Sequence, residues 1–289
     1  MQAVNDRGEQ MRVLAVHDIS CIGKCSLTVA LPVISSVGIE TAILPTAVLS
    51  THTGSGFKDF TYRDMTEDLM PIFCHWQKEK LCFDAMYVGY LGSEKQIDII
   101  ERIILNKSLN NTLIFIDPVM GDHGKLYANF NSDYPQKMLS FCKRADIITP
   151  NITEAVLMLN EEYTGGPYTE EYIEHLLKKL SQNGIKKIIL TGVYFDDTKL
   201  GVAIYDSEND KTEYVMSQKL PGFYDGTGDI FASSFVAAVM HGKTLQRAAQ
   251  IAEMFVVESI KATALHKNER CYGVNFESAI QNFIEYMQE

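Results

Sequence analysis

Pro221-Gly222-Phe223-Tyr224-Asp225-Gly226-Thr227-Gly228-Asp229 is followed at once by an apolar stretch that has the spacing of a helix. The last glycines of the run therefore lie where a helix begins. The start of a helix leaves several backbone N–H groups unpaired and carries the positive end of the helix dipole. Glycines at 226 and 228 let the backbone close around an anion, so the stretch predicts an anion-binding loop.

Asp229 does not fit a simple anion site, because a carboxylate should repel the anion. The conflict is resolved if Asp229 takes a proton from an attacking hydroxyl while the N–H groups hold a transferring phosphate. The alternative is a structural one: an acid near a helix N-terminus favours the dipole, and the glycines only form a turn. Spacing alone leaves both interpretations open.

Composition narrows the class of protein. The chain has 289 residues, of which 46% are hydrophobic and 22% are charged, and this length allows one large α/β domain or two small ones. The formal net charge of −11 argues against nucleic acid as a partner, although a phosphorylated ligand needs only local donors or a metal. No apolar run approaches the roughly 20 residues of a membrane-spanning helix, so no membrane partner is expected. We expect residues 1–11 to form a flexible, polar N-terminal tail and not a secretory signal.

The cysteines do not have the paired short spacing of a zinc motif. Reduced thiols in a cytoplasmic protein are the better interpretation. The six cysteines are at positions 21, 25, 74, 82, 142 and 271.

Strand-length apolar segments alternate with helical patterns, which predicts βαβ units and a mostly parallel sheet covered on both faces. No linker or internal repeat interrupts the pattern, so a single domain over 12–289 is expected. Predicted strands cover 13–16, 41–44, 85–88, 113–116, 147–148 and 187–190, with a hairpin of 201–205 and 213–216. Predicted helices cover 27–37, 65–78, a segment including residues 97–104, 229–241, 245–263 and 276–288, and a long loop separates 116 from 147.

Ligands of such sheets bind at the carboxyl ends of the strands. The segments that follow the predicted strands are polar or glycine-rich, which predicts one shared crevice. They are His17-Asp18, 46–56, Gly89-Tyr90, 117–122, 149–154 and Thr191-Gly192.

Three familiar motifs fail. Gly23-Lys24 suggests a P-loop, but Asp18 stands where its first glycine should be and Cys25 replaces the Ser or Thr that would hold magnesium. No Gly-x-Gly-x-x-Gly follows a strand, so a dinucleotide cofactor is not expected. His17-Asp18 could belong to a hydrolase triad, but the nucleophile elbow Gly-x-Ser-x-Gly is absent.

Three loop motifs occur together in the chain, in this order: Asp117-Pro118-Val119-Met120-Gly121-Asp122, Thr149-Pro150-Asn151-Ile152-Thr153-Glu154-Ala155 and Gly226-Thr227-Gly228-Asp229. In this combination the chain resembles the ribokinase-like superfamily and, within it, the pyridoxal kinase group, from about residue 12 to about residue 265. The segments 49–54 and Gly89-Tyr90 are further matches. The resemblance implies a three-layer α/β/α sandwich with a mostly parallel central sheet. It also implies ATP-dependent phosphorylation of the 5′-hydroxymethyl group of a B6 vitamer, in pyridoxal 5′-phosphate salvage. The implied ion is Mg²⁺, with a monovalent cation such as K⁺ as an option, and the family habit is a homodimer.

The resemblance also implies roles for individual residues. Asp229 would be the base, and the N–H groups of Gly226, Thr227 and Gly228 would hold the γ-phosphoryl. The remaining implied roles divide between nucleotide, metal and substrate. Asn151 and Glu154 would position magnesium through waters, Asp117 would lie near metal and phosphates, Asp122 near the opening of the site, Thr191 and Gly192 at the nucleotide phosphates, and Asp18, Thr53, Tyr90 and His52 at the substrate.

Alternatives remain for several of these positions. Asp117-Pro118 could be a strand-ending turn, the segment from Asn151 to Glu154 could be helix capping alone, and Tyr90 could be an ordinary half-buried aromatic. Asp18 stands where pyridoxal kinases commonly carry Ser, which could favour pyridoxamine, because an acid can pair with an amine. The rival functions are a hydroxymethylpyrimidine kinase of thiamine synthesis and a non-catalytic protein that binds a vitamer or nucleotide.

Overall fold

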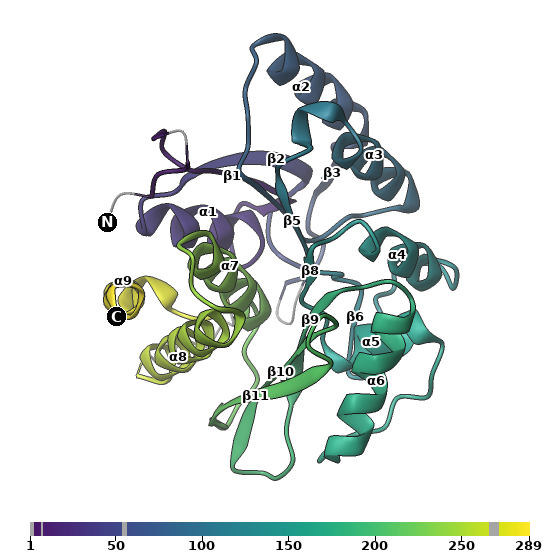
Figure 1. Ribbon diagram of the computed structural model, residues 1–289, viewed down its shortest axis with the longest axis vertical. Helices are drawn as coiled ribbons and strands as arrows, with labels where there is room; N and C mark the ends of the chain where they lie inside the picture. The colour runs from purple at the N-terminus through teal and green to yellow at the C-terminus, as the bar shows by residue number, and fades with distance from the viewer. Residues whose placement is uncertain (1–2, 7, 54–56, 266–271) are drawn as a thin grey trace. The chain divides into compact units, whose positions relative to one another are not determined.

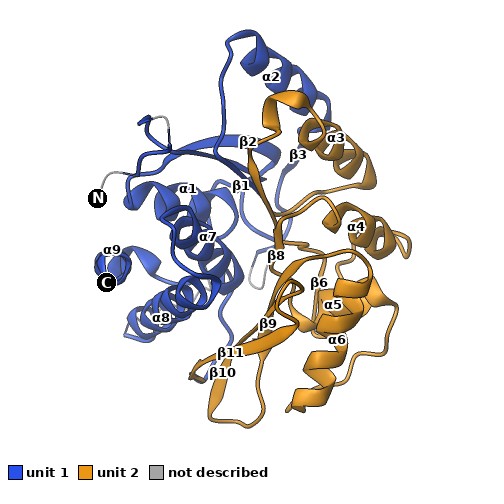
Figure 2. Ribbon diagram, viewed as in Figure 1, with its two compact units in different colours: residues 1–87, 220–289 blue, residues 88–219 orange. Residues whose placement is uncertain are grey.

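The computed structural model describes residues 3–6, 8–53, 57–265 and 272–289. Its elements fall into two units, one made of residues 1–87 and 220–289 and the other of residues 88–219 (Figure 2). Unit 1 is thus built from both ends of the chain, while unit 2 is continuous in sequence. The expected single domain over 12–289 stays a prediction.

Four strands form the sheet of unit 1, in the order β4-β1-β2-β3. They are β1 (Arg12–Ser20), β2 (Glu40–Leu49), β3 (Tyr62–Asp64) and β4 (Ala85–Val88). β1 and β2 are parallel from the pair Arg12 and Glu40 onward, whereas β3 is antiparallel to β2. Residues 13–18 of β1 are all buried, as expected for a parallel strand that is covered on both faces.

Strand order places the helices of unit 1. The chain leaves β1 for β2 on one side and later returns to β4 on the other side of β1. Crossover connections are right-handed, so the helices after β1 and before β4 cover opposite faces. Figure 2 shows α1 beside α7 and α8 on one face, and α2 on the other. The helices are α1 (Leu27–Ser36), α2 (Thr66–Lys78), α7 (Thr227–Met240), α8 (Leu245–Ala264) and α9 (Ile280–Gln288), with a 3₁₀ turn η2 (Phe276–Ser278).

In unit 2 the strand order is β11-β10-β9-β8-β5, with β5, β8 and β9 parallel and the hairpin of β10 and β11 antiparallel. The strands are β5 (Leu113–Ile116), β8 (Ile147–Ile148), β9 (Lys187–Val193), β10 (Lys199–Asp206) and β11 (Lys211–Gln218), and β6 (Gly121–Asp122) pairs separately with β7 (Lys125–Leu126). The helices, labelled in Figure 1, are α3 (Glu94–Ile104), α4 (Tyr134–Cys142), α5 (Ile152–Leu159) and α6 (Glu170–Gln182), with a 3₁₀ turn η1 (Lys107–Leu109). The predicted mostly parallel α/β architecture is confirmed.

Several elements of the structure were not predicted. β3, α5 and α6 have no counterpart among the predicted strands and helices. The long loop expected between residues 116 and 147 contains β6, β7 and α4. The helix α4 has a proline in its first turn and buries six of its nine side chains. Packing of these side chains stabilises a segment that is too short to be predicted as a helix from periodicity alone.

The N-terminal segment also differs from the flexible tail expected over 1–11. Val4 and Gln10 form an antiparallel bridge, and the Asn5 amide donates to Asp84 at 3.0 Å. Ala3 is only 2% exposed. These contacts tie the described part of the segment to the start of β4.

None of the helices in the part of the chain that the structure describes has the length and apolar character needed to cross a membrane.

Candidate active site

Gly226 begins α7 in a conformation that only glycine adopts readily. Its φ is +81°, and a Cβ built on it would lie 2.0 Å from the Lys24 carbonyl oxygen. A Cβ on Gly228, in the first turn, would meet nothing within 4 Å. The loop is therefore held tightly against the segment around Lys24, with the N–H groups of the first turn of a fourteen-residue helix at its end.

Asp229 lies in the first turn of α7, and its side chain is 16% exposed. The Nε2 atom of His17, at the carboxyl end of β1, lies 3.1 Å from Asp229 Oδ1. The strand order changes direction at β1, with β4 on one side and β2 on the other. A carboxyl end at such a switch point is where α/β sheets bind ligands, so Asp229 lies where chemistry is expected.

Asp18 completes a row of three side chains. Its Oδ1 lies 2.9 Å from His17 Nδ1, and the Ser20 hydroxyl donates to Oδ2 at 3.4 Å. Asp18 is only 7% exposed. His17 and Ser20 thus engage the Asp18 carboxylate, and its expected pairing with a substrate amine stays a prediction.

The electrostatics of this row favour a charged imidazole. Burial alone would lower the pKa of His17, but the hydrogen bonds and charges of Asp18 and Asp229 outweigh it and raise the pKa to about 10. Burial would raise the pKa of Asp18, but the hydrogen bond and charge of His17 outweigh it, and the pKa falls below its ordinary value. Burial, with the charge of Asp229, raises the pKa of the nearby Cys25 thiol to about 12, so that thiol stays protonated.

Two further residues of unit 1 were predicted to bind substrate. His52 is 5% exposed and packs edge-on against Phe57, with ring centroids 4.9 Å apart. Its ring also lies against Gly23, where a Cβ would come within 2.4 Å of it. His52 therefore acts in packing between loops, whereas Thr53 is exposed.

In unit 2, the segment from Asn151 to Glu154 forms a capping box at the start of α5. The Glu154 N–H donates to Asn151 Oδ1, and the Asn151 N–H donates to Glu154 Oε2, both at 2.8 Å. Glu154 Oε1 accepts the Met120 N–H at 3.1 Å, and the Asn151 amide donates to the Gly121 carbonyl at 3.0 Å. The capping alternative is thus correct in its geometry, and the same side chains connect α5 to the loop after β5.

Negative charge gathers around Glu154. Burial, followed by the charge of Asp117, raises its pKa well above the ordinary value, and Asp122 acts in the same direction. Within the described residues, no group of three His, Cys, Asp or Glu side chains could hold a metal ion directly. Since both oxygens of Glu154 already accept N–H groups, this cluster of acids fits a divalent cation that is held largely through water.

The other predicted residues of unit 2 lie at strand ends. Tyr90 accepts a hydrogen bond from the Asn129 amide at 2.9 Å, so its hydroxyl is tied to the loop before α4. The Thr191 N–H donates to the Pro150 carbonyl at 2.8 Å, and Gly192 has a φ of +76°. Asp122 is half exposed on β6.

Each unit thus brings together its own part of the predicted site. Unit 1 joins Asp18 and Asp229 through His17, and unit 2 joins Asp117, Asn151 and Glu154. His17 was placed in the predicted crevice because it follows a strand, but its contacts with both carboxylates were not predicted.

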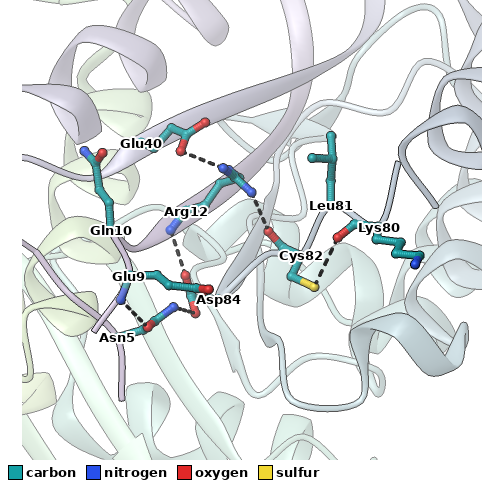
Figure 3. Close-up of a pocket in the computed structure, with 9 residues that line it drawn as sticks. All are labelled: Asn5, Glu9, Gln10, Arg12, Glu40, Lys80, Leu81, Cys82 and Asp84. Atoms are coloured by element: carbon teal, nitrogen blue, oxygen red, sulfur yellow. Dashed lines mark hydrogen bonds and ion pairs between the residues drawn. The ribbon is translucent and has the colours of Figure 1, made fainter. Parts of the chain in front are cut away.

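A separate cavity of about 350 Å³ lies at the opposite, amino ends of the unit 1 strands (Figure 3). The groups that line it bond to one another: the Arg12 guanidinium contacts Glu40 at 2.8 Å, and Asp84 accepts the backbone N–H of Arg12 at 2.8 Å. It lies away from the strand ends at which α/β sheets bind substrates.

Comparison with known proteins gives consistent matches. The sequence matches the phosphomethylpyrimidine kinase family over residues 46–275. A solved structure from Bacteroides thetaiotaomicron, described as a candidate phosphomethylpyrimidine kinase in a crystal form with pyridoxal, is 37% identical, with a TM-score of 0.88 over 94% of this chain and 95% of that one.

Two further proteins are similar along most of their length. The pyridoxal kinase of Lactobacillus plantarum is 31% identical, with a TM-score of 0.86 over 96% of this chain and 98% of that one. The pyridoxine/pyridoxal/pyridoxamine kinase of Bordetella avium is 24% identical over 264 residues, which is 88% of this chain and 86% of that one.

Proposed function

Since the chain belongs to the phosphomethylpyrimidine kinase family, and within the ribokinase-like superfamily to its pyridoxal kinase group, we propose that it is an ATP-dependent kinase of B6 vitamers. The reaction would phosphorylate the 5′-hydroxymethyl group of pyridoxal, pyridoxamine or pyridoxine. The observation that carries the proposal is the carboxylate of Asp229 in the first turn of α7, three residues after the tightly held Gly226.

Asp229 and the start of α7 would divide the chemistry between them. Asp229 accepts the proton of the attacking hydroxyl as the oxygen forms its bond to the γ-phosphorus and the bond from that phosphorus to the oxygen of ADP breaks. The N–H groups of Gly226, Thr227 and Gly228 hold the oxygens of the transferring group, where negative charge has to be stabilised. Phosphoryl transfer needs positioning and charge stabilisation more than covalent chemistry by the protein.

Mg²⁺ would be held near Asp117, with Asn151 and Glu154 acting through water, and it would neutralise charge on the nucleotide phosphates when bound. Thr191 and Gly192 would face those phosphates, and Asp122 would stand near the opening. Thr53 and Tyr90 would contact the vitamer, and His52 would belong to the substrate site. Asp18 would also contact the vitamer, while its Oδ1 lies 2.9 Å from His17 Nδ1.

We also propose a cytoplasmic homodimer, following the habit of the family. The proposal includes a monovalent cation such as K⁺, which is tested by replacing K⁺ with Na⁺ and tetramethylammonium in the assay.

The test is a measurement of ATP consumption by the purified full-length chain with pyridoxal, pyridoxamine, pyridoxine, hydroxymethylpyrimidine and ribose, each with and without EDTA. We expect turnover of the vitamers that EDTA abolishes. A relative named hydroxymethylpyrimidine/phosphomethylpyrimidine kinase supports hydroxymethylpyrimidine kinase as the rival. Turnover of hydroxymethylpyrimidine alone would establish that rival. Tight vitamer binding without any ATP consumption would establish a non-catalytic binding protein.

A further inference from the structure

His17 is held between two carboxylates at the carboxyl end of β1. Nδ1 lies 2.9 Å from Asp18 Oδ1, and Nε2 lies 3.1 Å from Asp229 Oδ1. The His17 side chain is 2% exposed, and those of Asp18 and Asp229 are 9% and 16% exposed. Both nitrogens of the buried ring thus contact a carboxylate, and Asp229 is the most exposed of the three side chains.

The protonation state of His17 decides whether its Nε2 atom donates a hydrogen bond to Asp229. In the charged ring both nitrogens carry protons, and each donates to one carboxylate. Because a carboxylate oxygen faces each nitrogen, the doubly protonated ring satisfies both contacts. In that ring Nε2–H donates to Asp229 Oδ1.

One oxygen of Asp229 is therefore anchored before any ligand arrives. Rotation about the side-chain bonds of an aspartate in the first turn of a helix would otherwise spread its oxygens over several directions. Ser20 adds to the anchoring from the other end, because its hydroxyl donates to Asp18 Oδ2 at 3.4 Å. The Tyr87 ring meets His17 edge-on, with centroids 6.4 Å apart, and limits tilting of the imidazole.

We propose that His17 is a positioning residue for the reaction: its Nε2–H holds Oδ1 of Asp229 and thereby presents Oδ2 to the hydroxyl of the substrate, while Asp18 orients the imidazole. The inference rests on the proposed function, in which Asp229 is the base. The proton of the substrate hydroxyl moves to Oδ2 as the oxygen–phosphorus bond forms, and the proton on Nε2 stays in place. His17 thus acts through Asp229 and never touches the substrate.

The alternative is a purely structural role, in which the buried row of charges only stabilises unit 1. Gln and Asn separate the two roles. The amide nitrogen of Gln reaches the place of Nε2, whereas that of the shorter Asn reaches only the place of Nδ1. Both substitutions remove the ring and its charge, so a structural role predicts similar losses for both.

The experiment measures steady-state kcat and KM for pyridoxal and for ATP in wild type, His17→Gln and His17→Asn, with unfolding midpoints in urea for each. We expect His17→Gln to keep kcat within about fivefold, and His17→Asn to lose about 10- to 100-fold with KM nearly unchanged, because a misdirected base fails in the transition state and not in binding. Equal kcat for the two variants at equal stability would overturn the proposal.

Failure of the inference can be told apart from failure of the proposed function. If Asp229→Asn keeps the kcat of wild type, Asp229 is not the base, and the proposed function loses its mechanism. If Asp229→Asn is inactive while His17→Asn is fully active, the mechanism stands and the positioning role is wrong. We expect the double variant His17→Asn with Asp229→Asn to be no slower than Asp229→Asn alone, because positioning acts only through that carboxylate.

Discussion

Replacement of Gly226 by Ala should damage stability and catalysis together. The new Cβ would lie 2.0 Å from the Lys24 carbonyl oxygen, whereas real contacts of this kind are not found below 3.0 Å. The backbone of the loop, of Lys24 or of both must therefore move apart by about 1 Å.

The magnitude follows from two costs. Holding a residue with a Cβ at positive φ costs roughly 1–2 kcal/mol. Relieving the overlap with a backbone oxygen costs about 1–3 kcal/mol, as overpacking does elsewhere. We expect the free energy of unfolding to fall by about 2–5 kcal/mol. A shift of about 1 Å at the start of α7 should also reduce kcat by about 10²-fold.

Gly228→Ala is the matched control, because its Cβ would meet nothing within 4 Å. It adds the same methyl group two residues along the same loop, and alanine forms helix better than glycine, so stability should change by less than about 1 kcal/mol. Urea unfolding and the ATP-consumption assay measure both variants. A Gly226→Ala protein as stable and as active as Gly228→Ala would refute the argument for a tightly held loop.

Three further predictions concern charge. Asp229→Asn should lower kcat at least about 10²-fold while nucleotide affinity, measured by titration, survives; normal turnover would contradict the assigned base. The pKa of His17 is raised to about 10, so the stability that it contributes is complete below pH 6.5 and is lost as pH rises through 10. Unfolding measured across this range should therefore show a decline that is shallower in His17→Gln, and equal slopes would argue against the charged ring. Glu154→Ala leaves two N–H groups without their acceptor and should cost about 2–3 kcal/mol in urea unfolding, whereas the exposed Glu162→Ala should cost less than about 0.5 kcal/mol; equal costs would contradict the structural role of Glu154.

Local signals explain why much of the fold could be predicted. The strands at 85–88, 113–116 and 147–148 have the predicted bounds, because each is a short apolar run that ends at polar residues or glycine. β1 extends beyond the predicted 13–16 to Ser20, because pairing with β2 continues after the apolar run ends. Pairing between strands depends on tertiary structure, so the hydrophobic periodicity of one segment does not predict how far it extends.

The sequence indicated which residues belong to the candidate site better than it indicated which contacts they make. The capping box from Asn151 to Glu154 could be expected, since the residue types that cap a helix are local in sequence. The bond from Glu154 to Met120 could not, because it depends on how the loop after β5 meets α5. Asp18 was expected to face a substrate, and only the position of His17 shows that its charge is compensated inside the protein.

His17 shows why a pair of neighbouring residues can be noticed in the sequence while its third partner cannot be predicted. An imidazole beside an acid suggests a hydrolase triad, and the search for a serine is the natural next step. The structure brings the start of α7 to the end of β1 instead, so that the third member of the row is a second carboxylate. A nucleophilic serine would need the imidazole as its base, whereas a carboxylate is itself a base and needs only orientation. The same pair of neighbouring residues can therefore take part in different chemistry. Which chemistry it takes part in depends on the third side chain, which the position of α7 supplies here.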